Sequence, residues 1–184
     1  MNSCDKDDDE NVNNGGIGNT ITATIENGNR LNGKIDSVKA VFDYEDENGD
    51  WREYIAASAP YVNGGFTLHL HETLDDTYLE TISSVFDYVD YPEVTVTNNI
   101  TISNRNVKAV IAIVYAYKAG ETYSEDRFTF GTAIDAELGW EGRLMYANGD
   151  VSVTGSCDAS WEYNGKISET GTTKFNMFLK KGWN

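Results

Sequence analysis

An alternation near the C-terminal end, from Val151 to Tyr163, constrains the fold more than any other feature. Its odd-numbered residues are small or hydrophobic, and every residue between them is polar. A period of two is typical of a β-strand with one buried face. A slip of one residue would bury all the polar side chains, so the pattern also specifies the register of the strand.

Shorter alternating segments recur along most of the chain and are separated by turns rich in Asn and Gly. These segments cover residues 20–25, 38–44, 51–57, 66–70, 93–102 and 173–179. Residues 93–102 predict either one strand or a strand pair broken at Asn98-Asn99. Residues 107–118 are apolar on both faces in the middle, which is typical of a central strand. We therefore predict an all-β fold, a two-layer antiparallel β-sandwich.

One short segment has helical spacing instead. Its apolar residues are Leu74, Tyr78, Leu79 and Ile82. Asp75 and Asp76 stand at its start, where acidic side chains favour a helix N-terminus. The segment predicts one short helix of about two or three turns.

Charge and hydropathy exclude two classes of function. The formal net charge is −16, with only 14 Lys and Arg residues, whereas nucleic-acid binding depends on clustered basic side chains. The longest apolar run, Ala109–Tyr117, is far shorter than the ~20 residues of a membrane-spanning helix. We expect no nucleic-acid partner and no membrane-spanning helix.

The N-terminal residues indicate a tether. Cys4 is followed at once by an acidic run, residues 5–10, and then by an Asn- and Gly-rich stretch that ends at Gly18. Such a composition cannot bury apolar surface. We divide the chain into a lipidated or disordered acidic tether, residues 1–18, and a single β-sandwich domain, residues 19–184. A disordered tail with an incidental cysteine is the alternative interpretation.

Several of these segments resemble known proteins. Cys4 resembles the lipid-bearing residue of a bacterial lipoprotein, and the acidic run behind it resembles the surface-export signal of Bacteroidetes lipoproteins. Strand and turn motifs lie at residues 21–28, 38–42, 63–70, 148–154 and 179–184. They resemble small Bacteroides surface lipoproteins of unknown function, and the N-terminal half is similar to prealbumin-like (transthyretin-like) and carboxypeptidase-regulatory-like domains. The resemblance implies an immunoglobulin-like or prealbumin-like sandwich, anchored by lipid at the cell outer membrane and exposed on the cell surface.

Two groups of residues suggest metal binding, and each has a simpler explanation. His69 and His71 project from the same strand face, with Glu72 adjacent, but a catalytic zinc needs three protein ligands. A solvated strand face is favoured over a metal-dependent hydrolase. Residues 43–50 are dense in carboxylates but lack the EF-hand spacing. A charged hairpin tip is favoured there over weak calcium binding, and we expect no cofactor.

Catalytic motifs are missing from the sequence. No serine stands in a nucleophile elbow, and no glycine-rich phosphate loop precedes a helix. Cys157 lies at an inward position of its strand and is expected to pack as a small hydrophobe. We predict that the protein is not an enzyme.

Aromatic residues favour a binding function instead. The chain has four Trp and eleven Tyr, and aromatic faces pack against sugar rings while polar side chains bind the hydroxyls. Trp161 and Tyr163 share the inward parity of their strand, so we expect them in the core. The candidates for ligand binding are Trp51, Tyr61 and Trp140.

Two hypotheses follow. The first is a non-catalytic binding or adhesion module that recognises a glycan or another surface protein. The second is a structural accessory, or fimbria-like partner domain, that pairs through a free edge strand. Residues 173–179 are the expected edge.

Overall fold

The computed structural model describes residues 17–86, 94–118, 128–129, 143–163 and 166–184. In chain order, its elements are β1 (Thr20–Thr24), the 3-10 turn η1 (Gly28–Leu31), β2 (Ser37–Glu45), β3 (Trp51–Pro60), β4 (Gly65–His69), the 3-10 turn η2 (Asp76–Tyr78), β5 (Glu80–Thr81), α1 (Ile82–Phe86), β6 (Val94–Ile102), β7 (Lys108–Tyr117), β8 (Phe128–Thr129), β9 (Arg143–Ala147), β10 (Val151–Tyr163), β11 (Lys166–Leu179) and β12 (Gly182–Trp183).

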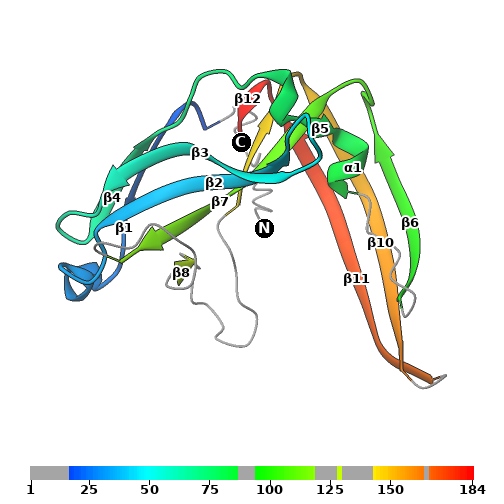
Figure 1. Cartoon of the computed structure of the whole chain (residues 1–184). Coiled ribbons are helices and arrows are strands. Elements are labelled where there is room, and N and C mark those ends of the chain that lie inside the picture. Colours follow the sequence, from blue (N-terminus) through cyan, green and yellow to red (C-terminus); the bar gives the residue numbers. More distant parts are fainter. Residues whose placement is uncertain (1–16, 87–93, 119–127, 130–142, 164–165) are drawn as a thin grey trace, which may run out of the picture.

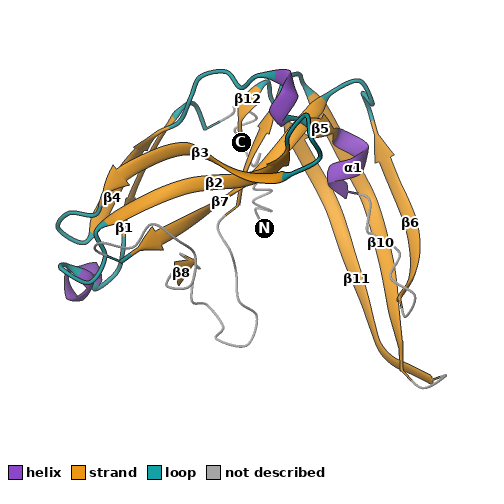
Figure 2. Ribbon diagram, in the orientation of Figure 1, coloured by secondary structure: helices purple, strands orange, loops and turns teal. Residues whose placement is uncertain are grey.

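The strands form two groups that diverge from a common region, like the limbs of an inverted V (Figures 1 and 2). One group, the body, contains a seven-stranded sheet and a two-stranded sheet. The other, the arm, is a three-stranded sheet in the order β11-β10-β6. All the strand pairs are antiparallel. The all-β prediction is therefore confirmed: antiparallel sheets pack together as in a β-sandwich, with one short α-helix in the described part.

The body has two layers. Its main sheet follows the order β12-β9-β7-β2-β3, with β5 and β8 also paired to β7, and the β1-β4 pair packs against it. Residues of both layers share one hydrophobic core, which includes Val38, Ala40, Leu68 and Leu70. β7 lies between β2 and β9, and its residues are buried or half-buried on both faces. The prediction of a central strand is thus confirmed.

Two turns follow the sequence expectation closely. Asn63 and Gly64 both have positive φ, 52° and 80°, and Val62 and Gly65 exchange backbone hydrogen bonds of 2.9 and 3.1 Å across them. Positive φ at both central residues is what a type I′ hairpin requires. Gly49, in the turn between β2 and β3, likewise has a φ of 82°.

The predicted helix is wrong in its length. The segment contains the turn η2, then the extended pair of residues β5, then the five-residue helix α1. Glu80 and Thr81 leave the helical path because they pair with Ala109 and Lys108 of β7. Asp75 does act as a cap, since its side chain accepts a hydrogen bond of 2.9 Å from the backbone N–H of Thr77.

The arm continues three neighbouring strands of the body. β6 leads into β7, β9 leads into β10, and β11 leads into β12. The order β11-β10-β6 in the arm therefore matches the order β12-β9-β7 in the body. The three connections, residues 103–107, 148–150 and 180–181, lie together where the two limbs meet, and we call this region the bend.

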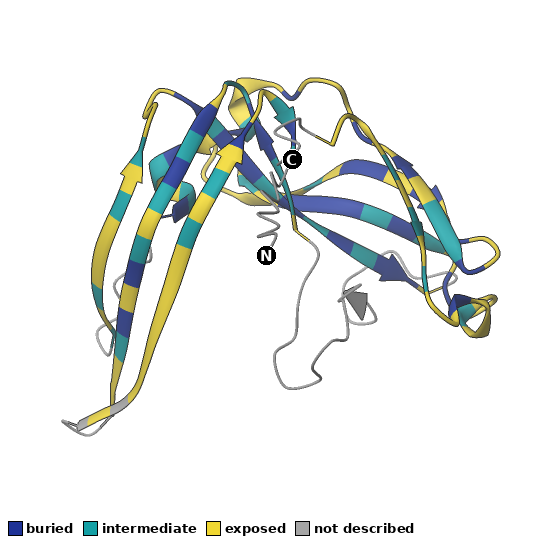
Figure 3. Ribbon diagram, turned by 180° about the vertical axis from the view of Figure 1, so that it is seen from behind, coloured by how far each residue is buried: buried dark blue, intermediate teal, exposed yellow. Residues whose placement is uncertain are grey.

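The two faces of the arm differ. The buried residues of β10 have odd numbers, such as Val153 and Cys157, and near the bend Val151 and Val153 share a second hydrophobic core with α1. The rings of Phe86 and Phe175 meet edge to face at 5.4 Å in this core. Figure 3 shows that the body is extensively buried, whereas the outer strands of the arm are largely exposed.

The parity predicted for β10 is correct, but burial ends before its last residues. Trp161 is 39% exposed, so the expectation that it belongs to the core is wrong. Its ring lies beside Gly171 of β11, 3.6 Å from where a Cβ there would stand. The side chain of Tyr163 lies outside the described residues. The Trp161 side chain is partly exposed because Trp161 lies near the end of β10, towards the tip of the arm, whereas α1 covers the sheet only near the bend (Figure 1).

β6 settles the choice left open for residues 93–102. It is one continuous strand that pairs with β10 from Val94 to Ile102 with no shift of register. Within the described residues, no helix has the length and apolar character needed to cross a membrane.

Candidate functional site

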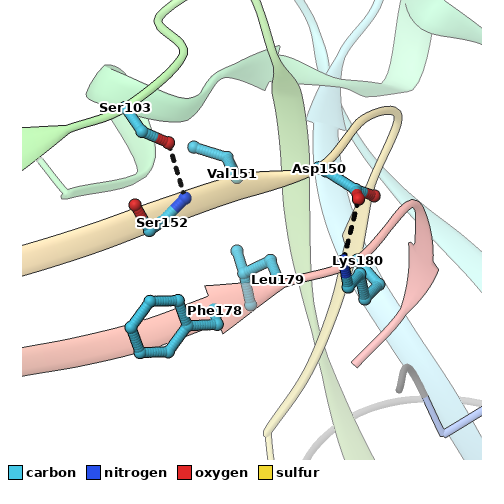
Figure 4. Close-up of a pocket in the computed structure, with 7 residues that line it drawn as sticks. All are labelled: Ser103, Asp150, Val151, Ser152, Phe178, Leu179 and Lys180. Atoms are coloured by element: carbon cyan, nitrogen blue, oxygen red, sulfur yellow. Dashed lines mark hydrogen bonds and ion pairs between the residues drawn. The ribbon is translucent and has the colours of Figure 1, made fainter. Parts of the chain in front are cut away.

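A shallow pocket of about 230 Å³ lies at the bend (Figure 4). Its lining comes from all three strands of the arm: Ser103 follows β6, Asp150 to Ser152 open β10, and Phe178 to Lys180 close β11. Residues far apart in the sequence meet here because the three connections of the bend lie side by side. The pocket therefore has a rigid frame made of strand ends.

Hydrogen bonds hold the polar wall of the pocket. The backbone N–H of Ser152 donates to Oγ of Ser103 at 2.8 Å, and the N–H of Ser103 donates to the carbonyl of Ser152 at 3.0 Å. The Ser103 hydroxyl replaces a backbone carbonyl as acceptor at the point where β6 leaves the sheet. Because the oxygen of the Ser103 hydroxyl is the acceptor in this bond, the hydroxyl can still donate its proton to a ligand.

Asp150 ties the start of β10 to the end of β11. Its carboxylate accepts one hydrogen bond from the backbone N–H of Lys181 at 2.9 Å and one from the ammonium of Lys180 at 3.0 Å. The hydrogen bond from the Lys181 backbone, followed by that from Lys180, lowers the pKa of Asp150 below its ordinary value. The pocket thus presents a carboxylate hydrogen-bonded to an ammonium group.

Phe178 is the unusual member of the lining. It is 56% exposed, and Figure 4 shows its ring on the side of Ser152, away from the Asp150–Lys180 ion pair. Its position is opposite Ser152 in the β10-β11 register. An exposed aromatic ring can pack against the apolar side of a sugar ring, and the hydroxyls and the ion pair elsewhere in the pocket can bond the hydroxyls of a sugar.

From this pocket, a polar face extends along the arm. Neighbouring residues of β6, β10 and β11 form four successive rows across the sheet: Thr101–Thr154–Asn176, Asn99–Ser156–Lys174, Thr97–Asp158–Thr172 and Thr95–Ser160–Thr170. All of these residues are exposed or half-buried. We call this surface the hydroxyl face, because Ser, Thr and Asn make up ten of its twelve members.

The hydroxyl face is regular in its spacing. Strands lie about 4.8 Å apart and same-face residues recur about every 6.7 Å along a strand, so hydrogen-bonding groups form a lattice. Some side chains of this face hydrogen-bond each other: the Thr172 hydroxyl donates to the carboxylate of Asp158 at 2.6 Å. The face suits an extended ligand that is itself rich in hydroxyls.

The aromatic residues expected to bind ligand are not brought together. Trp51 is 67% exposed at the start of β3. Tyr61 follows the other end of that strand, about 30 Å away at the rise of an extended chain. Tyr61 is also buried, at 7% exposure, and its hydroxyl donates to the carbonyl of Gly28 at 3.1 Å. Its exposure was wrongly predicted, because the chain folds η1 over it. Trp140 lies outside the described residues.

Each of the two histidines contacts a different hydroxyl group. Nδ1 of His69 lies 3.3 Å from Oγ1 of Thr20, and Nδ1 of His71 lies 2.9 Å from the hydroxyl of Tyr54. Glu72 is exposed beside them. In the described part of the chain, no three His, Cys, Asp or Glu side chains gather as a metal site.

In the acidic hairpin between β2 and β3, a carboxylate is hydrogen-bonded by groups of the hairpin itself. The carboxylate of Asp46 accepts hydrogen bonds from the backbone N–H groups of Asn48 and Asp50 and from the Arg52 side chain, at 2.9–3.1 Å. The backbone of Asp50 first, then Arg52, lowers the pKa of Asp46. These bonds use the oxygens that a calcium ion would need, which favours the charged hairpin tip.

Cys157 is buried and is a free thiol. Burial, followed by the charge of the adjacent Asp158, raises the pKa of its thiol. A raised pKa disfavours the nucleophilic thiolate, as expected for a structural residue. Cys4 lies outside the described residues.

A second pocket, of about 380 Å³, lies beside β1 and β4. Its lining includes Thr22, Pro60, Val62 and Phe66 and contains no charged residue. Thr22 and Thr67 bond each other there at 3.0 Å. The pocket at the bend is the stronger candidate, because it combines an exposed aromatic ring with charged and hydroxyl groups.

Phe178 was missed from the sequence, although a signal was present. The core residues of β11 have odd numbers, such as Phe175 and Leu179, so an aromatic residue at an even position must face outwards. The hydroxyl face has a similar signal in the threonines of residues 95–101. Neither signal indicates that the strands are neighbours, which only the fold shows.

Known proteins offer no further guidance: no family model, curated protein or solved structure matches the chain.

Proposed function

We propose that the protein is a non-catalytic module that binds a glycan through the arm. The observation that carries the proposal is the exposed ring of Phe178, which stands in a pocket with Ser103, Ser152 and the Asp150–Lys180 pair. Phe178 provides the stacking surface, and the polar groups bind the hydroxyls of the same sugar. The hydroxyl face would hold the following sugars of an extended chain.

A binding role accounts for the pocket better than a catalytic one. Its lining, as described, includes two serines and no histidine; the carboxylate of Asp150 and the ammonium of Lys180 bond each other, and the Ser103 hydroxyl accepts from the backbone of Ser152, so no Ser–base pair is formed. The pocket is also open rather than enclosed in a water-excluding cleft. Recognition needs only the surface that is present.

Charge indicates which glycans fit. The chain has a net charge of −16, which repels polyanions at long range. Within the site, Asp150 is neutralised by Lys180, and the hydroxyl face has one acidic and one basic residue, Asp158 and Lys174. Neutral polysaccharides are therefore the preferred class, ahead of sulfated or uronic-acid-rich ones.

The place of action follows from the sequence. Lipidation of Cys4 would tether the domain through the acidic segment to the outer membrane, where an exposed arm could reach polymers outside the cell. Stable anchoring needs more than one acyl chain or a second signal, and the resemblance to lipoproteins implies a Cys that carries two or three chains. The mass of the acyl chains on Cys4 of the natural protein tests this part of the proposal separately.

The test of glycan binding is an array of neutral and acidic glycans, followed by calorimetric titration of the neutral glycan that binds best. Phe178→Ala should weaken binding about fivefold or more, because an aromatic contact contributes about 1 kcal/mol beyond its buried area. Ile167→Ala is the matched control, since Ile167 is also exposed and lies at the opposite end of β11. A flat array, or equal binding by the Phe178 variant and the wild type, would refute the proposal.

The alternative function, a structural accessory that pairs through an edge strand, is supported by a separate observation. β11 lies at an edge of the arm, as predicted for residues 173–179, and β6 lies at the other edge. The two edges differ in their chemistry.

A further inference from the structure

Among the described residues, β6 lies at an edge of its sheet, and its own sequence lacks the usual protection of an edge strand. Edge strands of natural proteins commonly have charged residues, proline or bulges that prevent pairing with other chains. β11 has Lys166, Glu169 and Lys174, and β3 has Arg52, Glu53 and Pro60. The nine residues of β6 include no charge and no proline, and its register shows no shift.

The backbone groups of β6 that point away from β10 can be assigned from the described pairing. Ser103 donates its N–H to Ser152 of β10, so odd-numbered residues of this strand bond to β10. In an antiparallel ladder, the residues between them direct their N–H and C=O groups to the other side. The outward groups are therefore those of Val94, Val96, Asn98, Ile100 and Ile102. Consistent with this, the N–H of Ile100 bonds to Oδ1 of Asn98 at 3.1 Å.

The sequence of β6 is nearly palindromic about Asn98. If two copies of the strand are laid antiparallel with Asn98 opposite Asn98, the pairs are Val94 with Ile102, Thr95 with Thr101, Val96 with Ile100 and Thr97 with Asn99. Apolar β-branched residues meet on either side of the central Asn98 pair on one face, and the Thr and Asn99 side chains meet on the other face. Such cross-strand pairs stabilise a sheet.

The same alignment satisfies the backbone. The backbone N–H and C=O of Asn98, at its centre, point away from β10. The pairs 94–102, 96–100 and 98–98 therefore all become hydrogen-bonded pairs. About ten main-chain hydrogen bonds would form. The local bond from Ile100 to Asn98 is replaced by one of them.

We propose that β6 pairs with β6 of a second copy of this chain across a two-fold axis at Asn98. Two-fold interfaces bring the same patch of each subunit together, which a self-complementary strand fits. The fold permits the approach: β6 ends at the bend and begins towards the tip of the arm (Figure 1). An antiparallel partner therefore has its body beyond the opposite end of the pair.

Pairing would join the two arms into one six-stranded sheet. The hydroxyl faces of both copies would lie on the same side and would become continuous. The pairing does not depend on glycan binding, and its test involves no glycan.

The test is sedimentation velocity of the full chain over a range of concentrations, with a reductant to exclude disulfides through Cys4. The wild type should show a two-chain species. Asn98→Lys and Asn98→Asp should each lose it, because like charges then meet at the axis. An equal mixture of the two variants should regain it. Asn176→Lys, at an exposed position near the end of β11, is the matched control and should retain the wild-type mass.

Added salt should strengthen the wild-type pairing, because salt screens repulsion between two chains of net charge −16. Circular dichroism of each variant establishes that it is folded. A one-chain mass for the wild type at every concentration would overturn the proposal. So would a two-chain mass for both folded Asn98 variants, or a mixture that stays at one chain.

Discussion

Gly155, in the middle of β10, offers the sharpest test of the arm. Its φ is +123°, and a Cβ added there would collide with the carbonyl oxygen of Asn99 in β6. The strands approach closely at this point because glycine has no side chain on that side. Gly155→Ala should therefore weaken the pairing of β10 with β6.

The expected cost can be worked out from these two features. Holding a residue other than glycine at such a φ costs about 1–3 kcal/mol. Moving the Asn99 carbonyl away disturbs a hydrogen bond of the ladder, worth about 1 kcal/mol. Together they predict a loss of about 3 kcal/mol of unfolding free energy, which corresponds to about 1.5 M in the urea midpoint at a slope of about 2 kcal/mol/M.

Urea denaturation and native-state hydrogen exchange measure the effect. Exchange should accelerate in β6 and β10 and remain slow in β7, because the strain lies in the arm. Gly171→Ala in β11 is the control, since its Cβ would meet only the Trp161 ring at ordinary contact distance, 3.6 Å. A Gly155→Ala variant with an unfolding free energy within about 0.5 kcal/mol of the wild type, the scale of a neutral surface substitution, would refute the reasoning.

Two further predictions concern the body and the bend. Tyr61→Phe removes the hydroxyl that bonds to Gly28 and should lower the unfolding free energy by about 1 kcal/mol, because a buried hydrogen bond is lost; an unchanged thermal midpoint would contradict this. Asp150 has a pKa below its ordinary value of 3.8 in the folded state, so its contribution to stability is present above that pH and is lost as pH falls through the lowered pKa. The unfolding free energy of Asp150→Asn should therefore fall less than that of the wild type below about pH 4. Denaturation at a series of pH values measures this, and identical pH profiles would contradict the assignment.

Local patterns predicted strands well because their cause is local. The bounds of β10 match the alternation of residues 151–163, and β7 is central because it is apolar on both faces. The helix failed for a non-local reason: Glu80 and Thr81 pair with β7, and no spacing within the segment reveals that partner. Trp161 failed similarly, since parity gives the direction of a side chain but not what covers it.

The candidate site was less accessible to sequence reasoning. Trp51 was correctly expected to be exposed, but Tyr61 is covered by a segment about thirty residues earlier. Phe178 could have been recognised from its even position in β11. Its polar neighbours could not, because Ser103 and Asp150 join it only through the bend.

Hydrogen–deuterium exchange on the full chain, with and without the neutral oligosaccharide that binds best on the array, tests the central claim most directly. The account predicts slower exchange at residues 101–103, 150–156 and 174–180, the pocket and the adjoining rows of the hydroxyl face. Protection confined to the surroundings of Trp51, with the arm unchanged, would contradict it.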